Sequence, residues 1–126
     1  NNSLLPVIKS ELLQHLKQLA EHDQPHVIDL TSLPLCANDK QSLETFLGRG
    51  EVAITLSALG ESQIIETRYS GIWWIKHFAS EGQLLSEFIE ITRIPEIIQS
   101  QAEDIHQAIT ALTETQTEAD IEKQDQ

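Results

Sequence analysis

Apolar residues in the first part of the chain recur at intervals of three and four positions. This spacing places them on one face of an amphipathic helix, which we expect to cover a core. Ser3 is a suitable N-cap, Pro6 suits the first turn, and residues 23–25 (Asp-Gln-Pro) end the helix. The apolar positions of this helix are Leu5, Ile8, Leu12, Leu16 and Leu19.

A short strand and a second helix are expected next. Residues 26–30 (HVIDL) are typical of a strand, and a turn connects them to Asn38. Asn38 with Gln41 three residues later resembles a capping box, which predicts the start of a helix. Its apolar positions are Leu43, Phe46 and Leu47, followed by Gly48 and Gly50 as a C-terminal signal.

From Glu51 onward, apolar and polar residues alternate with the period of a strand. This pattern predicts strands over residues 51–57, 62–69, 72–78 and 84–92, which are separated by short glycine-containing turns. Consecutive strands with such short connections favour an antiparallel meander. A third helical region begins at Pro95, and Ser100 with Glu103 resembles a second capping box. Its apolar positions are Ile98, Ala102, Ile105, Ile109 and Leu112.

These elements predict the fold class α+β. We expect a two-layer domain in which helices pack on one face of a four-stranded antiparallel meander, with one short additional strand. The domain is expected to span residues 1–114. Residues 115–126 are polar and acidic and have no apolar face, so we expect them to form a disordered tail.

Charge and composition narrow the possible functions. The chain of 126 residues has a formal net charge of −12, which argues against binding to a nucleic-acid backbone. No apolar run reaches the roughly 18 residues of a membrane span, and the N-terminal residues lack the pattern of a secretory signal. A single cysteine, Cys36, excludes an internal disulfide and a cysteine-based metal cluster within one chain. These features favour a cytoplasmic protein.

No group of residues forms a recognisable catalytic motif. His15, His22 and His26 lie close together in sequence, which leaves a metal- or cofactor-handling site as the alternative to solvent-facing histidines at a helix end. Cys36 has no activating base nearby and is expected to be a small, partly buried residue. Glu66, Glu87 and Glu90 lie on neighbouring strands, where solvated cross-strand charge pairs are the commoner arrangement. We therefore expect neither an enzyme nor a bound cofactor or metal.

The segment SGIWWIKHF, residues 70–78, contains two adjacent tryptophans. On a strand, Trp73 and Trp74 point to opposite faces, so only one of them can face the helices directly. The other is either an exposed anchor for a protein partner, buried under a loop or the first helix, or covered in a homodimer. The first alternative predicts a protein contact surface at Arg68, Tyr69, Trp73, Trp74, Lys76 and Phe78.

Five stretches together resemble the C-terminal region of the HupH/HyaF hydrogenase-expression family. They are LPL at 33–35, LGRGEV at 47–52, IIET at 64–67, GIWWI at 71–75 and FIEITRIPEI at 88–97. The resemblance covers residues 4–112 and leaves the acidic tail outside. It implies an accessory factor or chaperone in the maturation of nickel–iron hydrogenase. The implied partner is the precursor of the iron–sulfur small subunit or another maturation protein. The family has no established set of catalytic residues to transfer.

Overall fold

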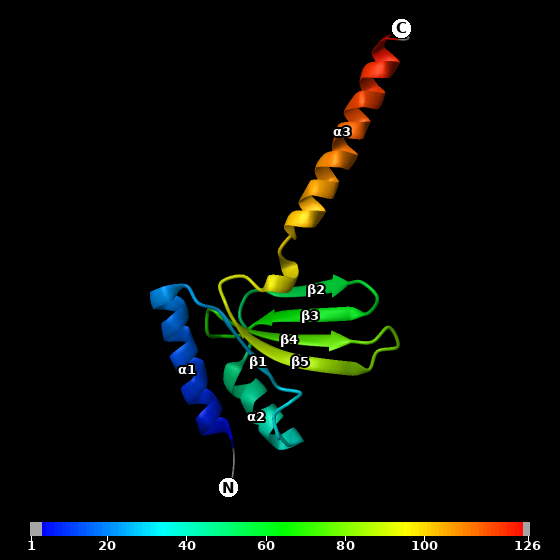
Figure 1. Cartoon of the computed structure of the whole chain (residues 1–126). Helices are drawn as coiled ribbons and strands as arrows, with labels where there is room; N and C mark the ends of the chain where they lie inside the picture. Colours follow the sequence, from blue (N-terminus) through cyan, green and yellow to red (C-terminus); the bar gives the residue numbers. More distant parts are fainter. Residues whose placement is uncertain (1–3, 125–126) are drawn as a thin grey trace. The chain divides into compact units, whose positions relative to one another are not determined.

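The computed structural model describes residues 4–124, in two compact units that divide between Glu96 and Ile97 (Figure 1). The first unit contains two helices and five strands. In chain order they are α1 (Leu5–His22), β1 (His26–Asp29), α2 (Ala37–Leu47), β2 (Ala53–Ser57), β3 (Glu61–Glu66), β4 (Ile72–Phe78) and β5 (Leu84–Ile91). A 3-10 turn, η1 (Glu96–Ile98), follows, and the second unit contains the long helix α3 (Ala102–Gln124).

The five strands form one antiparallel sheet in the order β1-β5-β4-β3-β2. The predicted meander is therefore confirmed, and the short strand β1 joins it as an edge strand beside β5. Helices α1 and α2 lie on the same face of the sheet (Figure 1). This arrangement confirms the α+β class with helices on one face.

The core lies between this face and the two helices. Trp74 on β4 stands between Ile89 on β5 and Ile65 on β3, and Leu43 and Leu47 of α2 are completely buried. The predicted apolar face of α1 is confirmed, since its members are buried or packed against the core. Burying one such aliphatic side chain contributes about 1.5–3 kcal/mol. The buried members of the core are Ile8, Leu12, Leu19, Ile28, Leu30, Leu43, Leu47, Ile72, Trp74, Ile89 and Ile91.

The start of α2 differs from the sequence-based prediction. Cys36, not Asn38, is the N-cap: its backbone is extended, and its Sγ accepts a hydrogen bond from the backbone N–H of Asp39 over 3.4 Å. A thiol sulfur is a weak acceptor, so this cap had no strong signal in the sequence. Cys36 is also exposed, and the expectation that it is partly buried is wrong. Ser3, the suggested cap of α1, lies outside the described residues.

The opposite face of the sheet is covered by the chain that follows β5. Trp73, Ile75 and Ile64 lie on this face and are all buried. The indole N–H of Trp73 donates to the carbonyl of Thr92 over 3.1 Å, and Pro95 is completely buried. Residues 92–96, which we call the strap, therefore pack on the face that the helices leave open.

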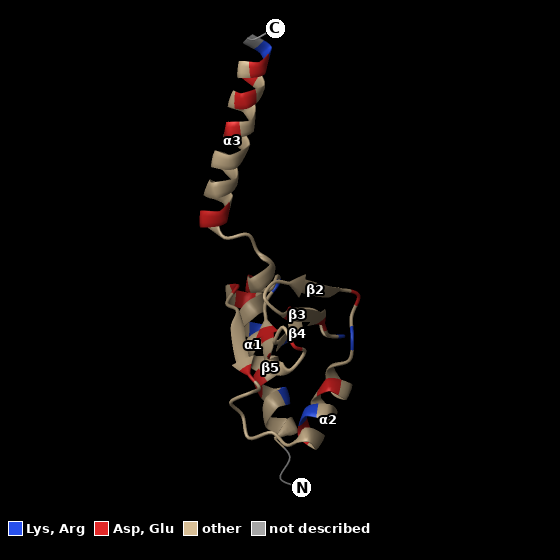
Figure 2. Cartoon of the chain, turned by 90° about the vertical axis from the view of Figure 1, so that its right-hand side faces the viewer, with Lys and Arg blue, Asp and Glu red and all other residues tan. Residues whose placement is uncertain are grey.

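Helix α3 continues beyond the predicted domain boundary at residue 114. Residues 115–124 are helical in the structure, whereas their sequence predicts a tail without regular structure. Six of these ten residues are Glu, Gln, Ala or Lys, which are good helix formers even without a buried face. Acidic residues recur along α3 (Figure 2). Over residues 4–124, no helix is both long and apolar enough to cross a membrane.

Candidate functional site

The turn between β3 and β4 is held by a compact set of hydrogen bonds around Thr67. The buried hydroxyl of Thr67 donates to the carbonyl of Ile72 over 2.8 Å and accepts from the backbone N–H of Tyr69 over 3.2 Å. Gly71 in this turn has φ = +93°, and a Cβ there would lie 3.2 Å from the Leu16 side chain of α1. The turn is thus fixed against α1, and Arg68 and Tyr69 project from it.

The glycine-containing loop after α2 packs against the same end of the sheet. A Cβ on Gly50 would lie 2.6 Å from the carboxylate of Glu66, and a Cβ on Gly48 would lie 2.7 Å from Nε of Arg68. The carboxylate of Glu66 accepts the backbone N–H groups of Glu51 and Val52, over 2.9 and 3.2 Å. Small residues are required here because the end of β3 and the start of its turn occupy the space of a side chain.

The strap is attached to this region as well. The backbone N–H of Thr92 donates to the carbonyl of Gly71, and the carboxylate of Glu90 accepts the N–H of Glu96 over 3.1 Å. The four longer stretches that carry the family resemblance are therefore bonded to one another at one end of the sheet. They are residues 47–52, 64–67, 71–75 and 88–97.

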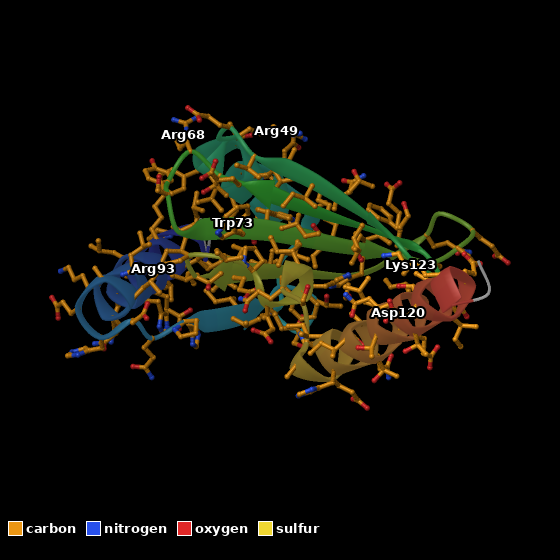
Figure 3. All side chains as sticks on the ribbon, turned by 90° about the horizontal axis from the view of Figure 1, so that it is seen from above. Arg49, Arg68, Trp73, Arg93, Asp120 and Lys123 are labelled. Atoms are coloured by element: carbon orange, nitrogen blue, oxygen red, sulfur yellow. The ribbon has the colours of Figure 1, made fainter. Side chains whose placement is uncertain are left out.

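The exposed side chains of this end include Arg49, Arg68 and Tyr69. No ion pair is formed by either arginine with any residue between 4 and 124. Arg49 and Arg68 lie at the same margin of the sheet (Figure 3). In a chain with a net charge of −12, two unpaired guanidinium groups are available to an acidic partner.

An apolar groove of about 150 Å³ lies beside Tyr69, between α1 and α2. Phe46 of α2 stacks with Tyr69 at a centroid distance of 5.3 Å, and Nζ of Lys9 lies 4.1 Å from the centroid of Phe46. Leu13 of α1 lines the groove and is 56% exposed. We use the name groove surface for Lys9, Leu13, Phe46, Arg68 and Tyr69.

A larger recess, of about 520 Å³, opens at the other end of the sheet between the β2–β3 and β4–β5 turns. Its only titratable lining residue is Glu61, which is exposed. A single solvated carboxylate offers no acid–base pair and no set of metal ligands. The groove surface is the better candidate, because it combines apolar side chains with unpaired cations.

The six residues predicted as a contact surface do not form one exposed patch. Trp73 and Trp74 are 7% and 3% exposed, so both are buried. Lys76 is half-buried and pairs with Glu44 over 3.3 Å, and Phe78 is half-buried at the far end of β4. Only Arg68 and Tyr69 are exposed. Sequence reasoning missed Lys9, Leu13 and Phe46; Leu13 carried a signal, since it lies outside the core-facing positions of α1.

Trp74 takes part in a buried polar network. Its indole N–H donates to Glu87 over 2.9 Å, and the other carboxylate oxygen of Glu87 pairs with Lys40 of α2. The backbone N–H of Glu87 also donates to the hydroxyl of Thr31 over 3.0 Å. This network connects β5, β4 and α2, so its function is structural.

The three carboxylates expected to form solvated cross-strand charge pairs make other interactions in the structure. They are Glu66, Glu87 and Glu90. Glu66 and Glu90 accept backbone N–H groups of neighbouring segments, and Glu87 binds Trp74 and Lys40. Glu87 lies on the face of the helices, and Glu90 lies on the opposite face. They therefore do not converge as an acid–base pair.

The structure brings together two of the three histidines proposed for a metal site. The rings of His15 and His26 stack with a centroid distance of 3.5 Å and an interplanar angle of 5°. Burial lowers the pKa of His26, and the nearby charge of His15 lowers it further. His22 is exposed and lies 3.9 Å from Glu21. Within residues 4–124, no group of three or more His, Cys, Asp or Glu side chains is placed to hold a metal ion.

Comparison with known proteins identifies the family. The family described as HupH hydrogenase expression protein, C-terminal conserved region, matches residues 5–119. Hydrogenase expression/formation protein HupQ of Azotobacter chroococcum mcd 1 is 38% identical over 106 residues, which cover 82% of this chain and 37% of that protein. Hydrogenase-1 operon protein HyaF of Escherichia coli (strain K12) is 33% identical over 104 residues, covering 82% and 36% respectively.

A solved structure has the same fold. Hydrogenase expression protein HupH from Thiobacillus denitrificans ATCC 25259 superposes with a TM-score of 0.83 at 37% identity, over 90% of this chain and 94% of that one. The chain spans little more than a third of the length of the two relatives named above. It belongs to the HupH hydrogenase expression protein family, through the C-terminal conserved region of that family.

Proposed function

We propose that this domain is a non-enzymatic accessory factor in the maturation of nickel–iron hydrogenase. It acts in the cytoplasm and binds the precursor of the iron–sulfur small subunit or another maturation protein. The names of its relatives, which are hydrogenase expression/formation proteins, support a role in this process. The observation that carries a binding role is the exposed groove surface, which consists of apolar side chains beside unpaired cations.

The groove surface supports binding of a segment that presents an apolar side chain next to acidic residues. An apolar side chain would fill the space between α1 and α2 and displace water from Leu13 and Phe46. Carboxylates beside it would face Lys9 and Arg68. Aromatic and arginine residues such as Tyr69 and Arg68 are enriched among the side chains that dominate binding energy.

Titration calorimetry against the apo small subunit, repeated with the large subunit, tests this proposal. Saturable binding to one of them is expected. Leu13→Ser should weaken that binding at least about tenfold, which corresponds to about 1.4 kcal/mol. Val7→Ser is the matched control, because Val7 is 60% exposed on the same helix and does not line the groove. Equal affinities of the two variants would exclude the groove surface as the contact.

In this proposal Trp73 and Trp74 do not contact the partner, and they affect binding only because they stabilise the fold. Their substitution by Ala is expected to lower the free energy of unfolding by about 3–5 kcal/mol, as for other buried aromatic residues. Urea unfolding of both variants measures this loss. A stable Trp73→Ala domain that no longer binds its partner would restore Trp73 as a direct contact.

A further inference from the structure

The two edges of the sheet differ in how they are protected against pairing with another strand. The β1 edge is short, follows Pro25 and carries the charged or ionisable residues His26 and Asp29. Proline and charged residues are common devices that block edge pairing. The β2 edge reads AITLS and contains no charge and no proline, and its pairing with β3 has no bulge. It is the unprotected edge of the sheet.

The hydrogen-bonding pattern identifies which groups of β2 are free. The carbonyl of Val52 accepts from Glu66, and the N–H of Ala58 donates to Gly60. In an antiparallel ladder, residues whose backbone groups bond to the neighbouring strand alternate with residues whose backbone groups point away from it. Ile54 and Leu56 therefore also bond to β3. The backbone N–H and carbonyl groups of the intervening residues point away from the sheet. These residues are Ala53, Thr55 and Ser57, and all three are exposed.

We propose that two copies of this chain pair through the β2 edge, antiparallel, about a twofold axis at Thr55. This register joins two five-stranded sheets into one continuous sheet of ten strands. Thr55 faces Thr55 of the second copy, and Ala53 faces Ser57. Threonine pairs directly across antiparallel strands are favourable. In any other register, in which one copy is shifted along the other, fewer residues of β2 are paired than in the register centred on Thr55.

The side chains around β2 favour a second copy as the occupant. Ile54 is half-buried and lies opposite the half-buried Leu56 of the second copy on the same face, so pairing covers two apolar contacts symmetrically. Beyond the strand, Glu51 lies opposite Leu59, which is 95% exposed at the tip of the β2–β3 turn. No like charges therefore face each other across the axis, even though the chain as a whole has a net charge of −12.

Disulfide trapping tests the register in the full chain. Cys36→Ser removes the native thiol and places a preferred capping residue at the start of α2. In that background Thr55→Cys should form an intermolecular disulfide on mild oxidation. The two α-carbons of a hydrogen-bonded antiparallel pair lie about 5.5 Å apart, within the range of about 4.4–6.8 Å that a disulfide requires.

Ala53→Cys in the same background is the matched control. In the proposed register its two copies lie four residues apart along the strand, roughly 13 Å, which no disulfide can bridge. Non-reducing electrophoresis with mass spectrometry measures the yield of crosslinked dimer. A dimer from Thr55→Cys and none from Ala53→Cys supports the proposal. Equal yields from both variants, or no dimer from either, overturn it.

Sedimentation equilibrium of the unmodified chain provides the second measurement. A concentration-dependent dimer is expected, and Thr55→Pro should weaken it at least about tenfold because an outward N–H is lost. The variant keeps the β2–β3 ladder, since this N–H does not bond to β3, and its circular dichroism checks the fold. Thr55→Val is expected to dimerise like the native chain. A native chain that is monomeric at all concentrations, or a folded Thr55→Pro chain that dimerises equally well, contradicts the proposal.

Discussion

Glu87 is a buried acidic residue whose hydrogen bond to Trp74 can be tested separately from its ion pair with Lys40. Its carboxylate accepts from the indole of Trp74 and pairs with Lys40, whose side chain is partly exposed. Removing the acceptor leaves a buried indole N–H without a partner, whereas removing only the charge leaves it satisfied. Removing the acceptor should therefore destabilise the fold more than removing only the charge, because an unsatisfied buried donor costs about 1–3 kcal/mol.

Glu87→Ala is therefore expected to lower the free energy of unfolding by about 2–3 kcal/mol, and Glu87→Gln by about 1 kcal/mol. Urea unfolding followed by tryptophan fluorescence compares the variants with the native chain. Equal losses for Ala and Gln would mean that the ion pair with Lys40, and not the indole hydrogen bond, is the important interaction.

Gly71 and Gly82 have similar backbone angles but different surroundings, so comparing them distinguishes the effect of backbone strain from that of packing. Gly71 and Gly82 have φ values of +93° and +97°, so a side chain is strained at both. A Cβ on Gly71 would contact Leu16 and Leu19, but a Cβ on Gly82 would meet nothing within 4 Å. Gly82→Ala is expected to lower the free energy of unfolding by about 1–2 kcal/mol. Gly71→Ala is expected to lower it by more, because its Cβ would also contact α1. Thermal or urea unfolding measures both, and a smaller loss for Gly71→Ala would show that α1 does not pack tightly on this turn.

At the scale of elements, α1 and β1 meet through the stacked rings of His15 and His26. Because burial and His15 lower the pKa of His26 in the folded state, protonation of His26 favours the unfolded state. Stability from this pair is complete above the ordinary histidine pKa of 6.5 and is lost as the pH falls through the lowered value. The lowered pKa of Asp29 acts in a separate window below pH 4, since its ordinary value is 3.8.

The urea midpoint is thus expected to be lower at pH 5 than at pH 7.5. His15→Gln removes the second charge and should weaken this pH dependence, whereas the control His22→Gln should retain it, because His22 is exposed and outside the stack. An identical pH dependence in all three proteins would exclude the stacked pair as its origin.

The pairing of elements also shows where local sequence signals were sufficient. A strand forms in each predicted segment, although the one expected over residues 62–69 ends at Glu66. The order of β2 to β5 is confirmed, because short turns between alternating segments leave few other arrangements. The place of β1 beside β5 had no such signal: the two strands are far apart in sequence and are connected through the whole meander. The cap at Cys36 was missed because sulfur is a weak and uncommon cap.

At the scale of the whole molecule, the chain consists of one unit with a hydrophobic core and a second unit that contains α3. The described side chains of α3 are exposed up to Lys123, so the helix gains little from burial. Isolated helices are marginal in water even with favourable sequences. We therefore propose that the helix over residues 115–124 unfolds readily in solution; residues 125 and 126 lie outside the described part of the chain.

Deleting residues 115–126 is expected to change the free energy of unfolding by less than about 0.5 kcal/mol, as for other surface changes. In the intact chain, the amides of residues 115–124 should exchange with deuterium nearly as fast as those of an unstructured peptide. Amides of β4 in the same sample provide the protected reference. Strong protection of residues 115–124 would show that α3 is stabilised by a partner or by association.

The sequence by itself determined which helices and strands the first unit contains, but not all of their ends, together with the α+β class, the antiparallel meander and the family. These follow from residue periodicity, turn chemistry and ordered motifs, all of which are local along the chain. The tertiary structure decided that both tryptophans are buried, because the strap after β5 returns over Trp73. It also decided that Phe46, Tyr69 and Lys9 form a groove and that β2 is the unprotected edge. Such properties depend on which distant segments meet, and periodicity along the chain carries no information about that.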